Sequence, residues 1–260
     1  MEAVDSIVAA RIASITDDLV ASIRPLRFSA PVTHTYNPLV YARRGYDRYV
    51  ASFGDTVKEV ILVGMNPGPF GMAQTGVPFG DVEMVNGWMR INTRIAQPAE
   101  VHPKRPITGF SCTRREVSGQ RLWGWTKYRY EKPEAFFKQF FVLNYCPLVF
   151  TEESGRNCTP DKLPVDEKKR LFQICDQALR RSIEVFKPQW VVGIGGFAEK
   201  RINIALKGID LKIGRITHPS PANPKANQGW MLRVESELAA MGIDLPGLKE
   251  KARREVGSFS

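Results

Sequence analysis

The feature that most constrains the fold is a regular alternation of short apolar segments with segments of helical periodicity. The apolar segments have the length and composition of buried strands, and they lie at 60–64, 139–143, 190–194 and 211–216. The helical segments between and after them lie at 81–95, 166–186, 197–206 and 229–241. Short apolar strands that alternate with helices are typical of a parallel sheet covered on both faces. The sequence therefore predicts an α/β fold, a three-layer α/β/α sandwich around a central four-stranded parallel sheet.

The rest of the chain is assigned to the same domain. Residues 1–24 carry apolar side chains at roughly helical spacing, which predicts an N-terminal helix. Residues 25–55 are rich in proline, tyrosine and arginine, and we expect them to wrap the core as an extended connection. Because 260 residues can bury one large core and no linker or repeat interrupts them, we predict a single domain over residues 1–260.

Several classes of protein are disfavoured by simple patterns. The longest apolar runs, such as residues 60–63, are far shorter than the ~18 residues that a membrane span requires. Acids at positions 2 and 5 stand where a secretory signal would carry bases. The cysteines form no Cys-x-x-Cys pair, and His34, His102 and His218 form no close pair, so we expect neither a metal nor a cofactor. We expect an intracellular monomer, cytoplasmic in a bacterium or nuclear in a eukaryote.

The charge of the chain points to a polyanionic partner. The sequence has 37 Lys and Arg against 27 Asp and Glu, a net charge of 37 − 27 = +10. Two regions carry most of the excess: residues 101–132 have eight bases and two acids, or +6, and residues 196–233 have seven and two, or +5. If both regions reach one face, that face would attract phosphates. The aromatic residues interleaved in 101–132 either follow a nucleic-acid strand or belong to the core.

Each predicted strand runs into a segment rich in glycine, proline or polar residues. These segments are 64–71, 144–147, 193–198 and 218–224. Ligands of open α/β sheets bind outside the carboxyl ends of the strands, so the four segments are expected to line one cleft. The first segment lacks the Gly-x-x-x-x-Gly-Lys-Ser/Thr spacing of a phosphate loop, which disfavours nucleoside-triphosphate hydrolysis. The glycines at 193–196 are either a tight strand-to-helix turn or a helix start that presents N–H groups to a phosphate.

Two of these segments closely resemble the signature segments of the single-strand-selective monofunctional uracil-DNA glycosylases. They are Gly-Met-Asn-Pro-Gly-Pro-Phe-Gly-Met-Ala-Gln-Thr-Gly-Val-Pro-Phe-Gly at 64–80 and His-Pro-Ser-Pro-Ala-Asn-Pro-Lys-Ala-Asn-Gln-Gly-Trp at 218–230. Shorter segments at 115–119, 144–148 and 154–160 are also similar to that family, and the resemblance covers about residues 35 to 245. It implies the uracil-DNA glycosylase fold and hydrolysis of the N-glycosidic bond of uracil in DNA. It also implies 5-substituted uracils such as 5-hydroxymethyluracil as substrates, an abasic product, and a place in base excision repair.

The resemblance implies two catalytic residues. Asn66 matches the family asparagine that holds the attacking water, and His218 matches the histidine that faces uracil O2. An amide orients water but does not accept its proton as a carboxylate would, so a dissociative mechanism is expected. A neutral imidazole N–H aimed at O2 would then stabilise the departing uracil anion.

The resemblance also implies a set of base-binding residues. Asn144 matches the residue that reads the base, with a donor for uracil O4 and an acceptor for N3–H, a pattern that cytosine reverses. Phe79 matches the residue that stacks on the extruded base. Met65 and Gly68 are expected to supply backbone N–H groups or clearance, and a glycine near C5 would leave room for a 5-substituent.

The segment after His218 resembles the wedge that enters the base stack when a nucleotide is flipped. We assign to it Pro219, Ser220, Pro221, Ala222 and Asn223, and expect the prolines to make it stiff. Vertebrate members of the family carry an arginine at the position of Ala222 and another near Gly196. Their absence here predicts weaker filling of the vacated duplex position and inefficient excision from double-stranded DNA, with both single- and double-stranded DNA as expected partners.

Three alternatives remain at the level of sequence. A sister glycosylase for deaminated purines would be favoured if Asn144 did not face the base. A non-catalytic binder of damaged or single-stranded DNA would require neither Asn66 nor His218. A nucleoside-processing enzyme would leave the two basic regions unexplained.

Overall fold

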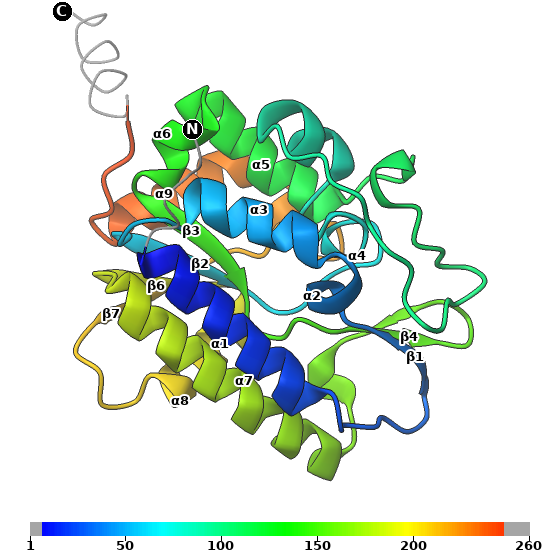
Figure 1. The fold of residues 1–260 in the computed structure, drawn as a ribbon. Coiled ribbons are helices and arrows are strands. Elements are labelled where there is room, and N and C mark those ends of the chain that lie inside the picture. Colours follow the sequence, from blue (N-terminus) through cyan, green and yellow to red (C-terminus); the bar gives the residue numbers. More distant parts are fainter. Residues whose placement is uncertain (1–6, 247–260) are drawn as a thin grey trace, which may run out of the picture.

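The computed structural model describes residues 7–246 and contains a four-stranded parallel sheet with the strand order β3-β2-β6-β7 (Figure 1). Its strands are β2 (Val60–Gly64), β3 (Phe140–Asn144), β6 (Trp190–Ile194) and β7 (Lys212–Ile216). Every described strand of this sheet had been predicted, and two of them begin one residue later than expected. All residues of β2 are buried, which agrees with its continuous apolar sequence and the lack of alternation between apolar and polar residues.

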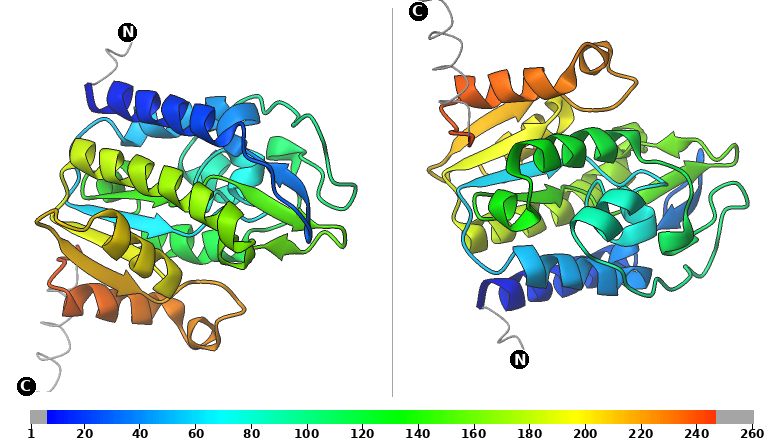
Figure 2. Two further views of the ribbon diagram at one scale, coloured as in Figure 1. Left: turned by 90° about the horizontal axis from the view of Figure 1, so that it is seen from below. Right: turned by 90° about the horizontal axis from the view of Figure 1, so that it is seen from above.

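Helices cover both faces of this sheet, which confirms the predicted sandwich. Figure 2 shows α7 (Val165–Phe186) and α8 (Gly196–Ala205) over one face, with α1 (Ile7–Ile23) packed on α7. The other face is covered by α5 (Val117–Tyr130), α6 (Pro133–Phe137) and α9 (Trp230–Ala240). The expected N-terminal helix is present from residue 7, and residues 1–6 of that prediction lie outside the described part. Helix α5 was not predicted.

The prediction of an extended connection over residues 25–55 is wrong. This segment forms β1 (Val32–Tyr36), α2 (Pro38–Tyr41) and α3 (Arg43–Phe53). Helix α3 covers the free edge of the sheet, where the Tyr49 hydroxyl donates to the carbonyl of Val142 (3.0 Å) and accepts from its N–H (3.3 Å). The edge of a sheet presents unpaired backbone groups, and the Tyr49 hydroxyl pairs with those of Val142 on the edge strand β3.

The segment 81–95 contains a helix, as predicted, but the helix is short. Only a short π-helix, Met84–Trp88, forms there, and the chain turns at Arg90 with φ = 57°. The buried carboxylate of Asp81 instead binds Arg115. The other elements are α4 (Met72–Thr75), β4 (Val149–Glu152) and β5 (Asn157–Cys158), and β4 pairs antiparallel with both β1 and β5 in a second sheet.

Most of the aromatic residues in the basic stretch 101–132 belong to the core. Trp123 and Trp125 are completely buried and Tyr130 is nearly so, whereas Tyr128 is 62% exposed. Within residues 7–246 no helix has the length and apolarity that crossing a membrane requires. All four cysteines are free.

Candidate active site

A cavity of about 610 Å³ opens at the carboxyl ends of β2 and β3. Its lining combines the loop after β2, the end of β3, the segment after β7 and the start of α5. Eight of the predicted site residues line it: Met65, Asn66, Gly68, Phe79, Asn144, His218, Ser220 and Pro221. The parallel register explains part of this gathering, because it pairs Gly64 directly with Asn144 at the same edge of the sheet. Pro219, Ala222 and Asn223 do not line the cavity.

His218 is a partly buried imidazole with a defined protonation pattern. Burial lowers its pKa from 6.5 to about 4, so the ring is neutral near pH 7. Its Nδ1 accepts a hydrogen bond from the N–H of Ser220 at 3.1 Å. A neutral ring whose Nδ1 accepts carries its proton on Nε2. Among residues 7–246 no protein acceptor takes that Nε2–H, which leaves it available to a ligand in the cavity.

Asn66 is held in one amide orientation by the backbone. Its Nδ2 donates to the carbonyl of Leu148 at 3.1 Å and to that of Pro67 at 3.3 Å. Both donors of the amide are thereby directed at the protein. Its Oδ1 accepts from no donor in the described chain and is free to accept from a bound molecule.

Phe79 and Asn144 meet above Gly64. A Cβ built on Gly64 would lie 2.6 Å from Oδ1 of Asn144 and 2.6 Å from the Phe79 ring, so only glycine permits this approach. The Nδ2 of Asn144 donates to the Met72 sulfur at 3.3 Å. Sulfur is a weak acceptor, so a carbonyl oxygen in the cavity would be a better partner for the same N–H.

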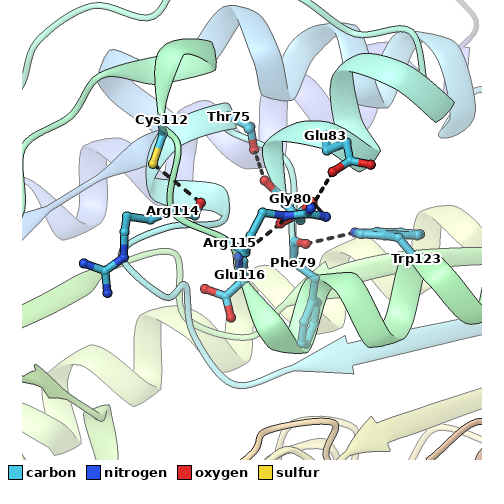
Figure 3. Close-up of polar contacts among 10 residues, drawn as sticks. Thr75, Phe79, Gly80, Glu83, Cys112, Arg114, Arg115, Glu116 and Trp123 are labelled. Carbon is cyan, nitrogen blue, oxygen red and sulfur yellow. Dashed lines mark hydrogen bonds and ion pairs between the residues drawn. The ribbon is translucent and has the colours of Figure 1, made fainter.

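The backbone of Phe79 is fixed in a strained conformation, with φ = 54°. Its carbonyl accepts from the indole N–H of Trp123 at 3.0 Å and from the N–H of Asp81 at 2.8 Å (Figure 3). Gly119 of α5 packs directly on this carbonyl, since a Cβ there would lie 2.0 Å from it. The start of α5 thus holds the Phe79 ring over the sheet edge.

The loop after β6 supports His218 from outside the cavity. Gly195, with φ = 91°, lies under the imidazole, and a Cβ there would be 3.1 Å from the Cβ of His218. The loop does not line the cavity, so only three of the four strand ends contribute to it. Gly195 joins the end of β6 to the start of α8, so a tight strand-to-helix turn is present, while phosphate binding by the start of α8 stays a prediction.

Polar contacts hold the segment after His218 at several points. The guanidinium of Arg121, on α5, donates to the carbonyl of Pro219 and to Oδ1 of Asn227, both at 2.9 Å. The amide of Asn227 in turn donates to the carbonyl of Pro221 at 2.9 Å. Asn223 donates to the carbonyl of His218 at 3.1 Å, and its side chain caps the 3₁₀-helix Pro224–Asn227. These contacts give Asn223 a structural role and identify Arg121 as a residue that sequence reasoning missed.

Glu116 is a second cavity residue that was missed. Its carboxyl group fills the space beside two glycines: a Cβ on Gly68 would lie 2.5 Å from its Oε2, and a Cβ on Gly71 2.9 Å from its Cγ. Burial raises its pKa, opposed by a hydrogen bond from the backbone of Ser118. The segment 115–119 resembled the family, but no single-sequence pattern marked this acid as part of the cavity.

The two basic regions contribute unequally to the cavity. Arg114 and Arg115 of the first region line it, whereas no cation of 196–233 does. That both regions share one phosphate-binding face stays a prediction. Several cations are already paired, including Arg129 with Glu235 and Arg201 with Asp176. No group of three His, Cys, Asp or Glu side chains within residues 7–246 has a metal-binding arrangement.

Comparison with known proteins agrees with the fold. Residues 51–239 match the family described as the uracil DNA glycosylase superfamily. That match covers most of the chain and includes the loop after β2, Asn144 and the segment after β7. The chain is therefore a member of this superfamily.

Closer relatives narrow the assignment. The chain is 43% identical over 233 residues to the single-strand selective monofunctional uracil-DNA glycosylase of Rattus norvegicus, covering 89% of this chain and 84% of that protein. It is 42% identical to the corresponding protein of Mus musculus over the same length, with 83% of that protein covered. The chain belongs to the single-strand selective monofunctional uracil-DNA glycosylase family.

One solved structure supports the fold alone. The crystal structure of wild-type Pedobacter heparinus SMUG2 superposes with a TM-score of 0.60 at 18% identity. The match covers 88% of this chain and 97% of that chain, so the shared architecture extends over nearly the whole neighbour.

Proposed function

We propose that this protein hydrolyses the N-glycosidic bond of uracil in DNA and leaves an abasic site for base excision repair. One observation carries the proposal: a single cavity brings together a neutral imidazole with a free Nε2–H, an amide oxygen free to hold water, and an amide beside an aromatic ring. A protein that only bound DNA would require none of these at the end of a buried sheet.

The reaction would begin with departure of the base. As the bond to the sugar breaks, negative charge develops on uracil, and the Nε2–H of His218 would donate to O2. The low pKa of His218 suits this role, because a neutral donor strengthens its hydrogen bond as charge appears without giving up its proton. Losing one such donor costs about 10²–10³ in rate.

The water would be held by Asn66. Its Nδ2 is engaged with two carbonyls, so Oδ1 would accept one hydrogen of the water and turn a lone pair toward the sugar. An amide oxygen is too weak a base to take the proton early. We therefore propose that a sugar with oxocarbenium character forms first and is then captured by the positioned water.

Recognition of uracil would rest on Asn144 and Phe79. On binding, the Nδ2 of Asn144 would exchange the Met72 sulfur for uracil O4, and its Oδ1 would accept from N3–H. Cytosine presents the opposite donor and acceptor pattern to such an amide. The Phe79 ring would stack on the base, with Met65 and Gly68 bordering it.

The finer substrate range is also a proposal. We expect 5-substituted uracils such as 5-hydroxymethyluracil to be accepted, with Gly68 near C5. We expect single-stranded DNA to be preferred over double-stranded DNA, because the wedge segment 219–223 carries the small, exposed Ala222.

The protein is proposed to act as a monomer and a single domain, since one chain lines the cavity and its core includes residues from Ala9 to Leu245. We also propose that it acts inside the cell, where its DNA substrate would be, in the nucleus of a eukaryote or the cytoplasm of a bacterium.

The first test is incubation with a single-stranded oligonucleotide that carries one uracil, in the presence of EDTA. Product strands are then separated with and without alkali treatment. Cleavage only after alkali is expected, because a hydrolytic glycosylase leaves an intact strand with an abasic site. An uncleaved strand after alkali would refute uracil as a substrate, and a panel of deaminated purines would then test the sister activity.

A further inference from the structure

The guanidinium groups of two arginines lie over the ring of Phe70, which lines the cavity. The guanidinium carbon of Arg114 lies 4.5 Å from the centroid of the Phe70 ring, and that of Arg105 lies 5.5 Å from it. Phe70 and Arg114 both line the cavity, and Arg114 is exposed. The roles proposed above for the catalytic and base-reading residues use none of these three side chains.

The charges of these arginines are not neutralised by the protein. Their neighbour Arg115 is paired with Asp81 and Glu83, and Figure 3 shows Arg114 extending away from that cluster. In the part of the chain that is described, no carboxylate lies within 4 Å of the guanidinium of Arg114 or Arg105. The segment 101–115 contains no acid, and the carboxyl group of the nearby Glu116 fills the space beside Gly68 and Gly71.

A stacked arginine of this kind is suited to an oxyanion. Contact with the ring face fixes the guanidinium plane, while the N–H groups at its edge stay free for a bidentate contact. Phosphate oxygens match that geometry, and arginine–phosphate pairs are among the stronger hydrogen-bonded contacts. A base that enters the cavity brings the phosphates on either side of its nucleotide to the cavity mouth.

We propose that Arg114, stacked on Phe70 with Arg105 beside it, binds a backbone phosphate next to the extruded nucleotide. The inference rests on the proposed DNA substrate. It assigns phosphate binding to two arginines of the first basic region, residues 101–132. The wedge segment also borders the cavity, through Ser220 and Pro221. The strand would therefore be held by charge at Arg114 and by the prolines of the wedge segment.

The first experiment measures binding of an undamaged single-stranded oligonucleotide at a series of salt concentrations. Loss of one phosphate contact lowers the slope of log K against log salt by about 0.7 for single strands. If the plots of log K against log salt for wild type and Arg114→Ala meet near 1 M salt, a slope difference of about 0.7 predicts about fivefold weaker binding of the variant at 0.1 M salt. Arg114→Lys, which keeps the charge, is expected to retain most of the slope.

Lys212→Ala provides a matched control. Lys212 is also an exposed cation over an aromatic ring, 5.4 Å from the centroid of Trp190, but it lies at the start of β7, at the opposite end of the sheet. Its removal is expected to leave the slope unchanged. Equal losses in both variants would overturn the proposal, because they would reflect net charge alone. Weaker binding of Arg114→Ala with an unchanged slope would also overturn it and would assign the site to base stacking on Phe70.

A second experiment locates the phosphate. Single phosphates around a uracil are replaced one at a time by neutral methylphosphonates, and binding is compared between wild type and Arg114→Ala. One replacement should weaken wild-type binding about fivefold and leave the variant unaffected. If every replacement weakens both proteins equally, the proposal fails. Absence of uracil release by the wild-type protein would refute the proposed function and leave the binding result on undamaged DNA to stand separately.

Discussion

Replacing Gly64 by alanine tests whether the base-reading residues have been assigned correctly. The new methyl group would lie 2.6 Å from both Oδ1 of Asn144 and the ring of Phe79, whereas ordinary contacts begin near 3.4 Å. Both neighbours are side-chain atoms that can move. The fold is therefore expected to survive, while the two groups that would hold uracil are pushed apart by nearly 1 Å.

The expected effect on catalysis is larger than that on stability. A misplacement of about 1 Å in a positioned group costs about 10²-fold in rate. Overpacking a buried site costs about 1–3 kcal/mol, or a fall in melting temperature of about 2–4 °C per kcal/mol in a chain of this size. Gly64→Ala should thus remain folded at 25 °C and release uracil about a hundredfold more slowly.

The assay is single-turnover release of uracil with enzyme in excess, together with thermal unfolding and binding to undamaged DNA. Gly124→Ala is the control, because a Cβ on this helical glycine would meet nothing within 4 Å. It is expected to keep full activity. Normal turnover by a folded Gly64→Ala protein would refute the assignment of Asn144 and Phe79 to the base. Unfolding of the variant would instead contradict the view that the neighbours of Gly64 can yield.

Three further residues give predictions of their own. Asn66→Ala should keep its affinity for DNA and lose most turnover, measured by gel shift and uracil release, and unchanged turnover would remove Asn66 from the mechanism. His218→Leu should slow bond cleavage by about 10²–10³ with little change in DNA affinity. Because the folded state lowers the pKa of His218 from 6.5 to about 4, the unfolded chain binds one more proton between those values. Wild-type stability should therefore fall by up to about 3 kcal/mol as pH drops from 6.5 to 4, whereas His218→Gln should lose that slope in chemical denaturation. Arg121→Ala removes the donors to Pro219 and Asn227, and is expected to reduce turnover on duplex more than on single-stranded DNA, by up to about tenfold, with Arg121→Lys partly restoring it.

The parallel sheet could be predicted because its strands are apolar at every position. The segment 60–64 is buried on both faces, so local composition is enough to mark it. The same local reasoning failed for 25–55, where the prolines suggested an extended chain. The segment instead contains α3, which buries Tyr46, Tyr49 and Phe53 in the core. At 81–95 local reasoning predicted a helix but not its length, because the helix ends at Trp88 and the chain turns at Arg90.

Several residues of the site could be named from sequence, although the contacts that explain them could not. The resemblance pointed to Asn66, Asn144 and His218, and the structure brings them into one cavity. Glu116, Arg114 and Arg121 carry no local signal, since a charged residue near a helix start is ordinarily a solvated one. Their positions depend on where α5 packs against the loop after β2 and the segment after β7.

The amino-acid sequence by itself determined the four strands of the parallel sheet, the edge of that sheet where the cavity forms, and the family. Those properties follow from local patterns: apolar runs bury themselves, and parallel strands bring their carboxyl ends to one side. Only the tertiary structure decided the protonation of His218, the amide orientation of Asn66, and which arginines stay unpaired. Such properties depend on burial and on hydrogen-bond partners contributed by segments far apart in the chain, as when Leu148 fixes Asn66 across 82 residues.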